Sequence, residues 1–146
     1  MKSYTSILSI LCLIFISTIA FGQKTTWETL KDVDFDKKYD KAAKMFVLVP
    51  RFGPKVLALS NKSIEITGYM IPIDVASNYY VLSANPYASC FFCGGSGPES
   101  VMSIKFKKAE RRFDTDERLT LRGRLVLNTD DAEELNYILK DAELVK

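Results

Sequence analysis

The fold is decided by a stretch in which apolar and polar residues alternate: Ser63-Ile64-Glu65-Ile66-Thr67-Gly68-Tyr69-Met70. Its even positions carry apolar residues or glycine, and its odd positions carry polar ones. Because an extended chain turns successive side chains to opposite faces, this period of two predicts a strand with one buried face. Gly68 lies in the middle of the stretch, where a glycine marks a bulge or a close approach of another backbone.

The same alternation recurs along the chain and predicts several more strands. It is cleanest from Leu119 to Leu127, where leucines alternate with polar and charged residues around Gly123. Pro50 and the Gly53-Pro54 pair end an earlier apolar segment, as proline and glycine do at turns. We therefore expect five or so short strands, which cover residues 45–50, 63–70, 79–83, 102–106 and 119–127.

The end of the chain predicts a helix. Asp130 is placed to cap free backbone amides, and Glu133, three residues later, completes a capping box. Short strands followed by one late helix favour a β-rich α+β fold over a parallel sheet, which needs more crossover helices. We expect a small antiparallel β-barrel similar to the oligonucleotide/oligosaccharide-binding (OB) fold, with residues 143–146 as an edge strand. The buried stripe of the expected helix consists of Ala132, Leu135, Leu139 and Ala142.

The first 22 residues predict a cleavable secretory signal peptide. Lys2 provides a positive start, and the apolar run over residues 7–20 is too short to span a bilayer comfortably. Ala20 and Gly22 place small residues three and one positions before a cut that leaves Gln23 as the first residue. The alternative is an uncleaved membrane anchor. We expect a periplasmic or secreted protein with no stable membrane span after cleavage.

Composition limits the classes of function. Residues 23–146 suffice for one modest core, so we expect an N-terminal arm over residues 23–44, with a helical turn or two, and a single barrel domain over residues 45–146. The chain has 20 basic and 18 acidic residues, a near balance that argues against a nucleic-acid binder. It has no His, so most hydrolytic mechanisms lack a general base of suitable pKa. We therefore expect a non-enzymatic protein without catalytic residues.

One turn carries distinctive chemistry, and it reads Cys90-Phe91-Phe92-Cys93-Gly94-Gly95. Two cysteines at this spacing can close a disulfide, cycle between dithiol and disulfide, or bind a soft metal ion as thiolates. Cycling is the weakest of the three, because Gly94 and Gly95 favour a flexible turn over the helix start that activates a redox pair. The spacing leaves the other two alternatives open.

Because the chain has no histidine, the choice of metal ions that it could bind is narrower. A zinc site with four ligands needs Cys90, Cys93 and two carboxylates such as Asp74 or Glu99, or ligands from a second protomer. Two thiolates suffice for Cu(I), whose softness favours sulfur. Met70 and Met102 are further sulfur candidates, although core packing is the commoner role of methionine on a strand.

The two leading hypotheses differ in partner. A domain that binds Cu(I) or zinc would exchange it with a metal transporter, whereas a disulfide-closed module would bind an envelope protein. Phe91 and Phe92 would shield a metal site, and packing is their alternative role. Tyr69, with Pro72, is a candidate to line a binding groove of the barrel, and Glu99 completes the candidate binding residues.

Two segments carry a family resemblance: the Gly-Tyr-Met-x-Pro pattern at residues 68–72, and Ser-Cys-Phe-Phe-Cys-Gly-Gly-x-Gly-Pro-Glu-Ser at residues 89–100. With the strand at 119–127, they resemble a group of uncharacterised secreted bacterial proteins over residues 45–146, in the form found in Bacteroidetes-type exported proteins. In wider relatives the turn carries a Cys followed shortly by a His and a proline run, and Cys93 replaces that His here. The resemblance implies the barrel fold and export, and it implies no activity.

Overall fold

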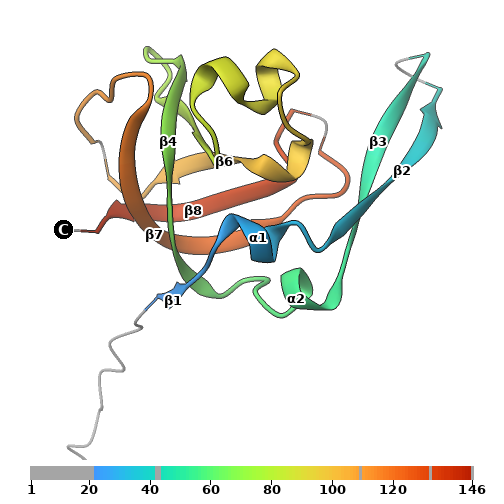
Figure 1. The fold of residues 1–146 in the computed structure, drawn as a ribbon, viewed down its shortest axis with the longest axis horizontal. Coiled ribbons are helices and arrows are strands. Elements are labelled where there is room, and N and C mark those ends of the chain that lie inside the picture. Colours follow the sequence, from blue (N-terminus) through green and yellow to red (C-terminus); the bar gives the residue numbers. More distant parts are fainter. Residues whose placement is uncertain (1–21, 42–43, 109, 132, 146) are drawn as a thin grey trace, which may run out of the picture.

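The computed structural model describes residues 22–41, 44–108, 110–131 and 133–145, so the predicted signal peptide lies outside it except for Gly22. No helix in these ranges is long and apolar enough to cross a membrane. The regular elements are β1 (Gln23–Lys24), α1 (Trp27–Leu30), β2 (Val33–Asp40), β3 (Met45–Phe52), α2 (Pro54–Leu57), β4 (Ser63–Asp74), β5 (Tyr79–Ser83), β6 (Val101–Phe106), β7 (Glu117–Leu127) and β8 (Tyr137–Leu144), and three 3-10 turns, η1 (Tyr87–Ser89), η2 (Phe91–Cys93) and η3 (Pro98–Ser100), separate β5 from β6 (Figure 1).

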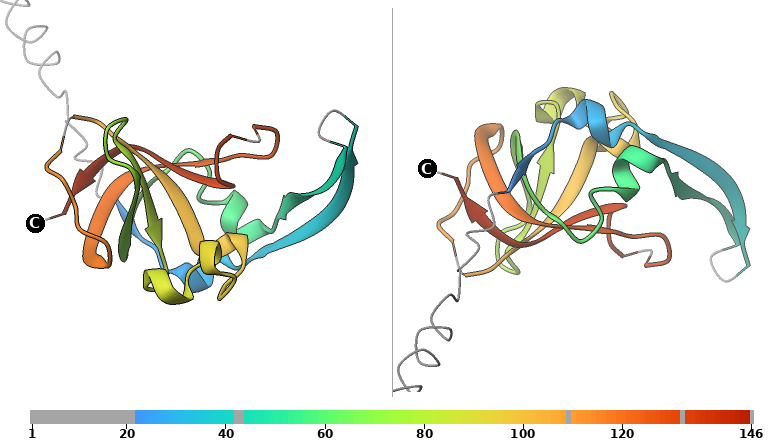
Figure 2. Two further views of the ribbon diagram at one scale, coloured as in Figure 1. Left: turned by 90° about the horizontal axis from the view of Figure 1, so that it is seen from above. Right: turned by 90° about the horizontal axis from the view of Figure 1, so that it is seen from below.

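Five strands close into a barrel. Four of them match predicted strands, whereas the predicted strand at 45–50 is β3, which lies outside the barrel, and the fifth barrel strand is β8. The order of the barrel strands is β4-β5-β6-β8-β7, and β7 returns to pair with β4 (Figures 1 and 2). Four of the five pairings are antiparallel, while β6 and β8 run parallel because β7 lies between them in the sequence. A small closed barrel of this kind is OB-like, which confirms the predicted architecture.

The strand that closes the barrel is β4, and it is longer than the sequence pattern suggested. Its first part pairs with β7 and its second part pairs with β5, so one strand takes part in both seams. Ile64, Ile66 and Met70 are fully buried or nearly so on its inner face. Gly68 keeps the register, and a Cβ added there would lie 2.6 Å from the carbonyl oxygen of Ser83. The glycine therefore allows the backbone of β5 to come close to β4. The bulge of β4 lies further on, between residues 72 and 74.

The core has two parts. The larger part fills the barrel with apolar side chains from every barrel strand. The smaller part lies beneath the cysteine turn and contains Ile71, Val81, Cys90 and Val101, with Phe91 packed against it. The barrel therefore supports the turn from below with a separate apolar cluster.

The predicted C-terminal helix is wrong, because residues 137–144 form strand β8. The register of β8 shifts against both β6 and β7 near Lys140, and Asp141 adopts a positive φ of 55°. This bulge places Leu139 and Ala142 on the same inner face, although they are three residues apart. The spacing therefore imitates a helical stripe, while Leu135 lies in the preceding loop and Ala132 lies outside the described residues.

The predicted capping box is also replaced by a loop. The side-chain oxygen of Asn128 accepts hydrogen bonds from the amides of Asp130 and Asp131, at 3.3 and 3.0 Å. The side-chain amide of Asn128 donates to three backbone carbonyl oxygens of residues 131–135. Asp131 accepts from the amide of Glu133 at 3.0 Å. Because these contacts satisfy the loop backbone, residues 128–136 need no helix.

The N-terminal arm contains the expected helical turn, α1, in which the Thr26 side chain accepts from the Thr29 amide at 3.4 Å. The arm joins the barrel by the parallel pairing of β1 with β4 and by two side-chain bonds: Trp27 Nε1 donates to the carbonyl oxygen of Thr67 at 2.8 Å, and the Tyr137 hydroxyl donates to that of Leu30 at 2.6 Å. The arm then continues as β2, which pairs with β3 in a separate hairpin that extends away from the barrel (Figure 2).

Candidate functional site

The cysteine turn lies between two paired strands at one end of the barrel. Ser83, the last residue of β5, pairs with Val101, the first residue of β6, so residues 84–100 form an insertion that returns to its starting point. Within it, Asn85 and Ser89 both contact the Ser96 hydroxyl, at 2.8 and 2.9 Å. These side-chain contacts hold the insertion in one conformation.

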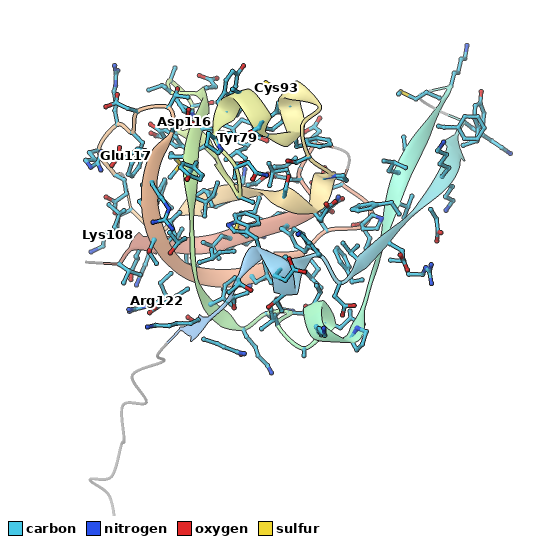
Figure 3. All side chains as sticks on the ribbon, in the orientation of Figure 1. Tyr79, Cys93, Lys108, Asp116, Glu117 and Arg122 are labelled. Atoms are coloured by element: carbon cyan, nitrogen blue, oxygen red, sulfur yellow. The ribbon has the colours of Figure 1, made fainter. Side chains whose placement is uncertain are left out.

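The two cysteines occupy different environments. Cys90 is fully buried in the small apolar cluster, whereas Cys93 is exposed, and both are free thiols. Partial desolvation, together with the charge and the side-chain hydrogen bond of Cys90, raises the pKa of the Cys93 thiol. Cys90 is therefore near enough to affect the titration of Cys93, and Cys93 lies at the outer surface of the turn (Figure 3).

The backbone of the turn is closed by local hydrogen bonds. The amides of Cys93 and Gly95 donate to the carbonyl oxygen of Cys90, at 3.2 and 3.1 Å, and the amide of Gly94 donates to that of Phe91 at 3.0 Å. Gly94 adopts a φ of 74°, which a glycine tolerates without strain. The glycine amides thus point to carbonyl oxygens, and they do not serve as donors to sulfur in this conformation.

The carboxylates proposed as extra zinc ligands do not join the cysteines. Asp74 caps its own turn by accepting from the amides of Ala76 and Ser77, at 2.9 and 3.3 Å. Glu99 lies near the end of α1: the pKa of Lys31 is raised mainly by its hydrogen bond to Glu28 and the charge of Glu28, and the charge of Glu99 adds to the effect. In the part of the chain that the structure describes, no three His, Cys, Asp or Glu side chains are grouped closely enough to hold a metal ion. The available sulfur ligands are therefore the two cysteines alone.

The other predicted site residues are spread over the molecule. Tyr69 is half-buried on β4, opposite Ser83 and Arg118, and does not line the groove described below. Phe91 packs on the small core cluster, while Phe92 is 45% exposed with its ring 5.6 Å from that of Phe91. Met70 and Met102 are fully buried in the barrel core, so the packing role is the one observed.

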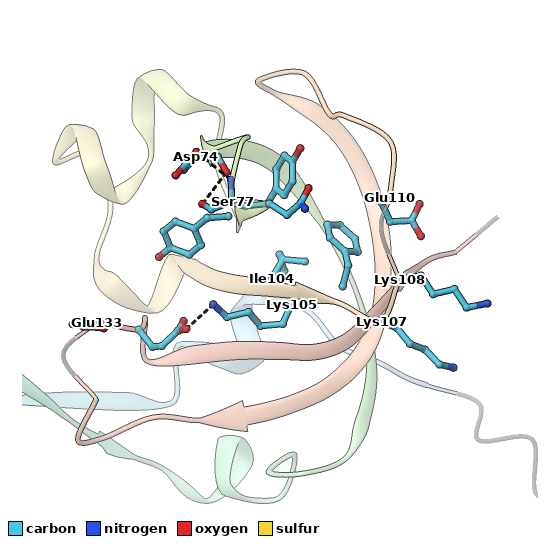
Figure 4. A pocket seen from close by; sticks show the side chains of 13 residues that line it. Asp74, Ser77, Ile104, Lys105, Lys107, Lys108, Glu110 and Glu133 are labelled. Atoms are coloured by element: carbon cyan, nitrogen blue, oxygen red, sulfur yellow. Dashed lines mark hydrogen bonds and ion pairs between the residues drawn. The ribbon is translucent and has the colours of Figure 1, made fainter.

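A groove on the barrel wall was not predicted. It has a volume of about 660 Å³ and lies over β5 and β6, between the turn at residues 74–78 and the loop at residues 128–136 (Figure 4). Lys105 crosses it, with its Nζ 2.6 Å from Glu134 and 5.3 Å from the centre of the Tyr79 ring. The second carboxylate oxygen of Glu134 is buried and has no hydrogen-bond partner among the described residues. This wall and these loops are where OB barrels bind ligands.

Two of the basic residues that follow β6 are paired with acids. Lys107 pairs with Glu143 at 3.0 Å, and Arg111 pairs with Glu117. Lys107 and Lys108 contribute to one end of the groove, beside Glu110. No sequence signal marks the groove, because its side chains come from three separate segments and each is ordinary in its own segment.

Comparison with known proteins supports the fold. No family model matches the chain, and no curated protein matches it. In structure, it is similar to the crystal structure of a DUF3299 family protein from Pseudomonas aeruginosa PAO1, with a TM-score of 0.54 and 11% sequence identity over 86% of this chain and 97% of that chain. At this identity the likeness extends to the fold alone.

Proposed function

We propose that this protein is exported and binds Cu(I) through the thiolates of Cys90 and Cys93, for exchange with a metal transporter. The observation that carries the proposal is a pair of free thiols on one turn, one buried and one exposed to solvent, in which Cys90 contributes to the raised pKa of Cys93. Cys93 gives an ion access from solvent, and Cys90 lies directly beneath it in an apolar cluster that excludes water. Soft thiolate ligands favour Cu(I), which accepts a low coordination number.

The ligand count favours Cu(I) over zinc. Structural zinc takes four protein ligands, and the described residues bring two sulfurs together without a third acidic, histidine or cysteine ligand. The pair is also poorly suited to thiol exchange, since the raised pKa of Cys93 keeps that thiol protonated at neutral pH. Metal binding then has to displace thiol protons, so we expect the apparent affinity for Cu(I) to increase with pH.

Replacing both cysteines, as Cys90→Ser with Cys93→Ser, is expected to weaken Cu(I) binding by at least about a hundredfold, because both ligands are lost. The measurement is anaerobic competition with a chromogenic Cu(I) chelator, using the processed protein recovered from outside the cytoplasm. Phe92→Ala is the matched control, since it changes an exposed side chain of the same turn and keeps both sulfurs. A double variant that retains the parent affinity, with the same circular dichroism, would refute the metal site.

A second function is favoured by the burial of Cys90. A thiolate is costly in an apolar cluster, whereas a disulfide between Cys90 and Cys93 carries no charge and pins the turn. In this case the protein is an envelope interaction module, and the groove over β5 and β6 is the surface for its protein partner. Intact mass with thiol counting separates the two functions: an inert, fully oxidised pair supports the module, and free thiols that retain copper support metal binding.

Export is tested on the same sample. Cleavage after Gly22 predicts the intact mass of a chain that starts at Gln23. An N-terminal glutamine often cyclises with loss of ammonia, so the cyclised mass counts as the same result. A mass that retains the apolar run at residues 7–20 would instead indicate the uncleaved anchor.

A further inference from the structure

The β2–β3 hairpin has one apolar face. Its strands form eight directly opposed pairs, and opposed residues of an antiparallel pair share a face. From the barrel outward, one face carries Val33 with Phe52, Phe35 with Pro50, Lys37 with Leu48, and Tyr39 with Phe46. The hairpin is a two-stranded sheet of its own and extends into solvent (Figures 1 and 2).

Only the inner half of this face is covered. Phe52 packs against Tyr137, with ring centroids 5.6 Å apart, and Pro50 is buried. Further out on this face, Leu48 is 51% exposed, Tyr39 52% and Phe46 67%. We call these three residues the hairpin tip; Met45, 56% exposed, lies beyond them on the other face. A group of exposed apolar side chains on one face of a bare two-stranded sheet marks an interaction surface.

Charge is divided along the hairpin. Near the barrel, Asp34 and Asp36 both pair with Arg51, at 3.2 and 3.6 Å. Toward the tip, the segment of residues 37–48 contains a single acidic residue, Asp40, and four lysines: Lys37, Lys38, Lys41 and Lys44. The described lysine side chains are exposed. The outer hairpin is therefore both apolar and positively charged.

We infer that the hairpin tip docks this protein on an anionic lipid surface. Aromatic and aliphatic side chains interleaved with lysines are typical of segments that lie in the membrane interface. The apolar groups enter the boundary between headgroups and acyl chains, while the lysine stems extend to bring their charges to the lipid phosphates. Neither cysteine takes part in this docking, although Phe91 of the cysteine turn lines the same cleft as Tyr39 and Leu48.

Two other occupants fit the tip less well. Lysine is depleted in the buried centres of protein interfaces, whereas here two lysines on β2 and two in the connection to β3 flank the apolar group. A second copy of the chain would bring two positively charged tips together, and like charges oppose such a contact. An anionic lipid surface complements both kinds of side chain, because its acyl boundary receives the apolar groups and its phosphates attract the lysines.

The test is flotation of the processed protein with vesicles of phosphatidylglycerol and phosphatidylethanolamine, against vesicles of phosphatidylcholine alone. We expect binding to the anionic vesicles that falls as salt is raised. Phe46→Asp with Leu48→Asp is expected to reduce it at least about tenfold, because two apolar anchors are lost. Lys37→Glu with Lys41→Glu is expected to reduce it by about fivefold for each lysine. Leu57→Asp is the matched control, since Leu57 is equally exposed, at 55%, on α2.

Several results would overturn the inference. One is failure of the parent protein to float with anionic vesicles, and another is a Leu57→Asp variant that loses as much binding as the tip variant. Self-association that the tip variant abolishes, without vesicle binding, would assign the surface to a second copy. Thermal unfolding and circular dichroism verify that each variant is folded. The cysteine double variant is expected to float like the parent, so failure of the metal site and failure of the docking surface are distinguishable.

Discussion

Replacing Gly123 with valine is expected to lower the free energy of unfolding by about 3 kcal/mol, because the side chain would enter a crowded part of the barrel wall. Gly123 is buried on β7 opposite the bulge of β8. A Cβ added there would lie 2.7 Å from Leu139 Cγ, 2.8 Å from the carbonyl oxygen of Lys140 and 3.2 Å from Ala142 Cα. Two of these neighbours are backbone atoms of β8, so the strand itself would have to shift.

The measurement is thermal and denaturant unfolding followed by circular dichroism, and a loss of this size lowers the melting temperature by roughly 10 °C. Gly94→Ala is the control: an added Cβ at Gly94 meets nothing within 4 Å, so the change tests only its positive φ. That strain costs about 1 kcal/mol. A Gly123→Val protein that melts with the parent would show that this position does not face the interior.

Tyr137→Phe is expected to destabilise the protein by about 1–3 kcal/mol. The change removes the 2.6 Å hydrogen bond to the carbonyl oxygen of Leu30 and leaves that buried oxygen without its partner. Because this bond joins α1 to the barrel, we expect the arm to become more sensitive to protease as well. Unfolding and limited proteolysis measure the two effects, and Tyr39→Phe, at a tyrosine that is 52% exposed, is the control.

The same tyrosine makes stability depend on pH. Burial raises the pKa of Tyr137 far above its ordinary value. The folded protein therefore keeps the phenolic proton at pH values where the unfolded chain, with a tyrosine pKa near 10, releases it. This contribution to the free energy of unfolding is constant below about pH 10 and then falls by about 1.4 kcal/mol per pH unit. Tyr137→Phe is expected to remove this part of the slope, and an unchanged slope would contradict the assignment.

The barrel was predictable because most of its strands have one buried face. Alternation over residues 63–70 and 119–127 identified the two strands that pair along the closing seam, and the structure places them opposite each other. The C-terminal strand was not predictable in this way, because the bulge at Asp141 breaks the period of two. β2 was also missed: Lys37 interrupts the apolar series of Val33, Phe35 and Tyr39 on a strand that leaves the barrel.

The candidate site was predictable only in part. The spacing of Cys90 and Cys93 singles out the turn, but their opposite exposure depends on the apolar cluster beneath, which comes from β4, β5 and β6. The groove over β5 and β6 requires the closed barrel, since Asp74 and Glu134 reach it from distant segments. Local patterns carry no information on such assembled surfaces.

The double pairing of β4 sets an order of events for folding. Met70 pairs with Leu82, a short distance along the chain, so this β-hairpin can form locally and early. Ser63 pairs with Arg124, and this contact has to wait for the last third of the polypeptide. Ring closure is thus a late and slow step, as pairings between distant residues are. A chain that has not yet placed β7 has an open sheet with a bare edge, and such an edge is exposed to pairing with other chains until β7 arrives.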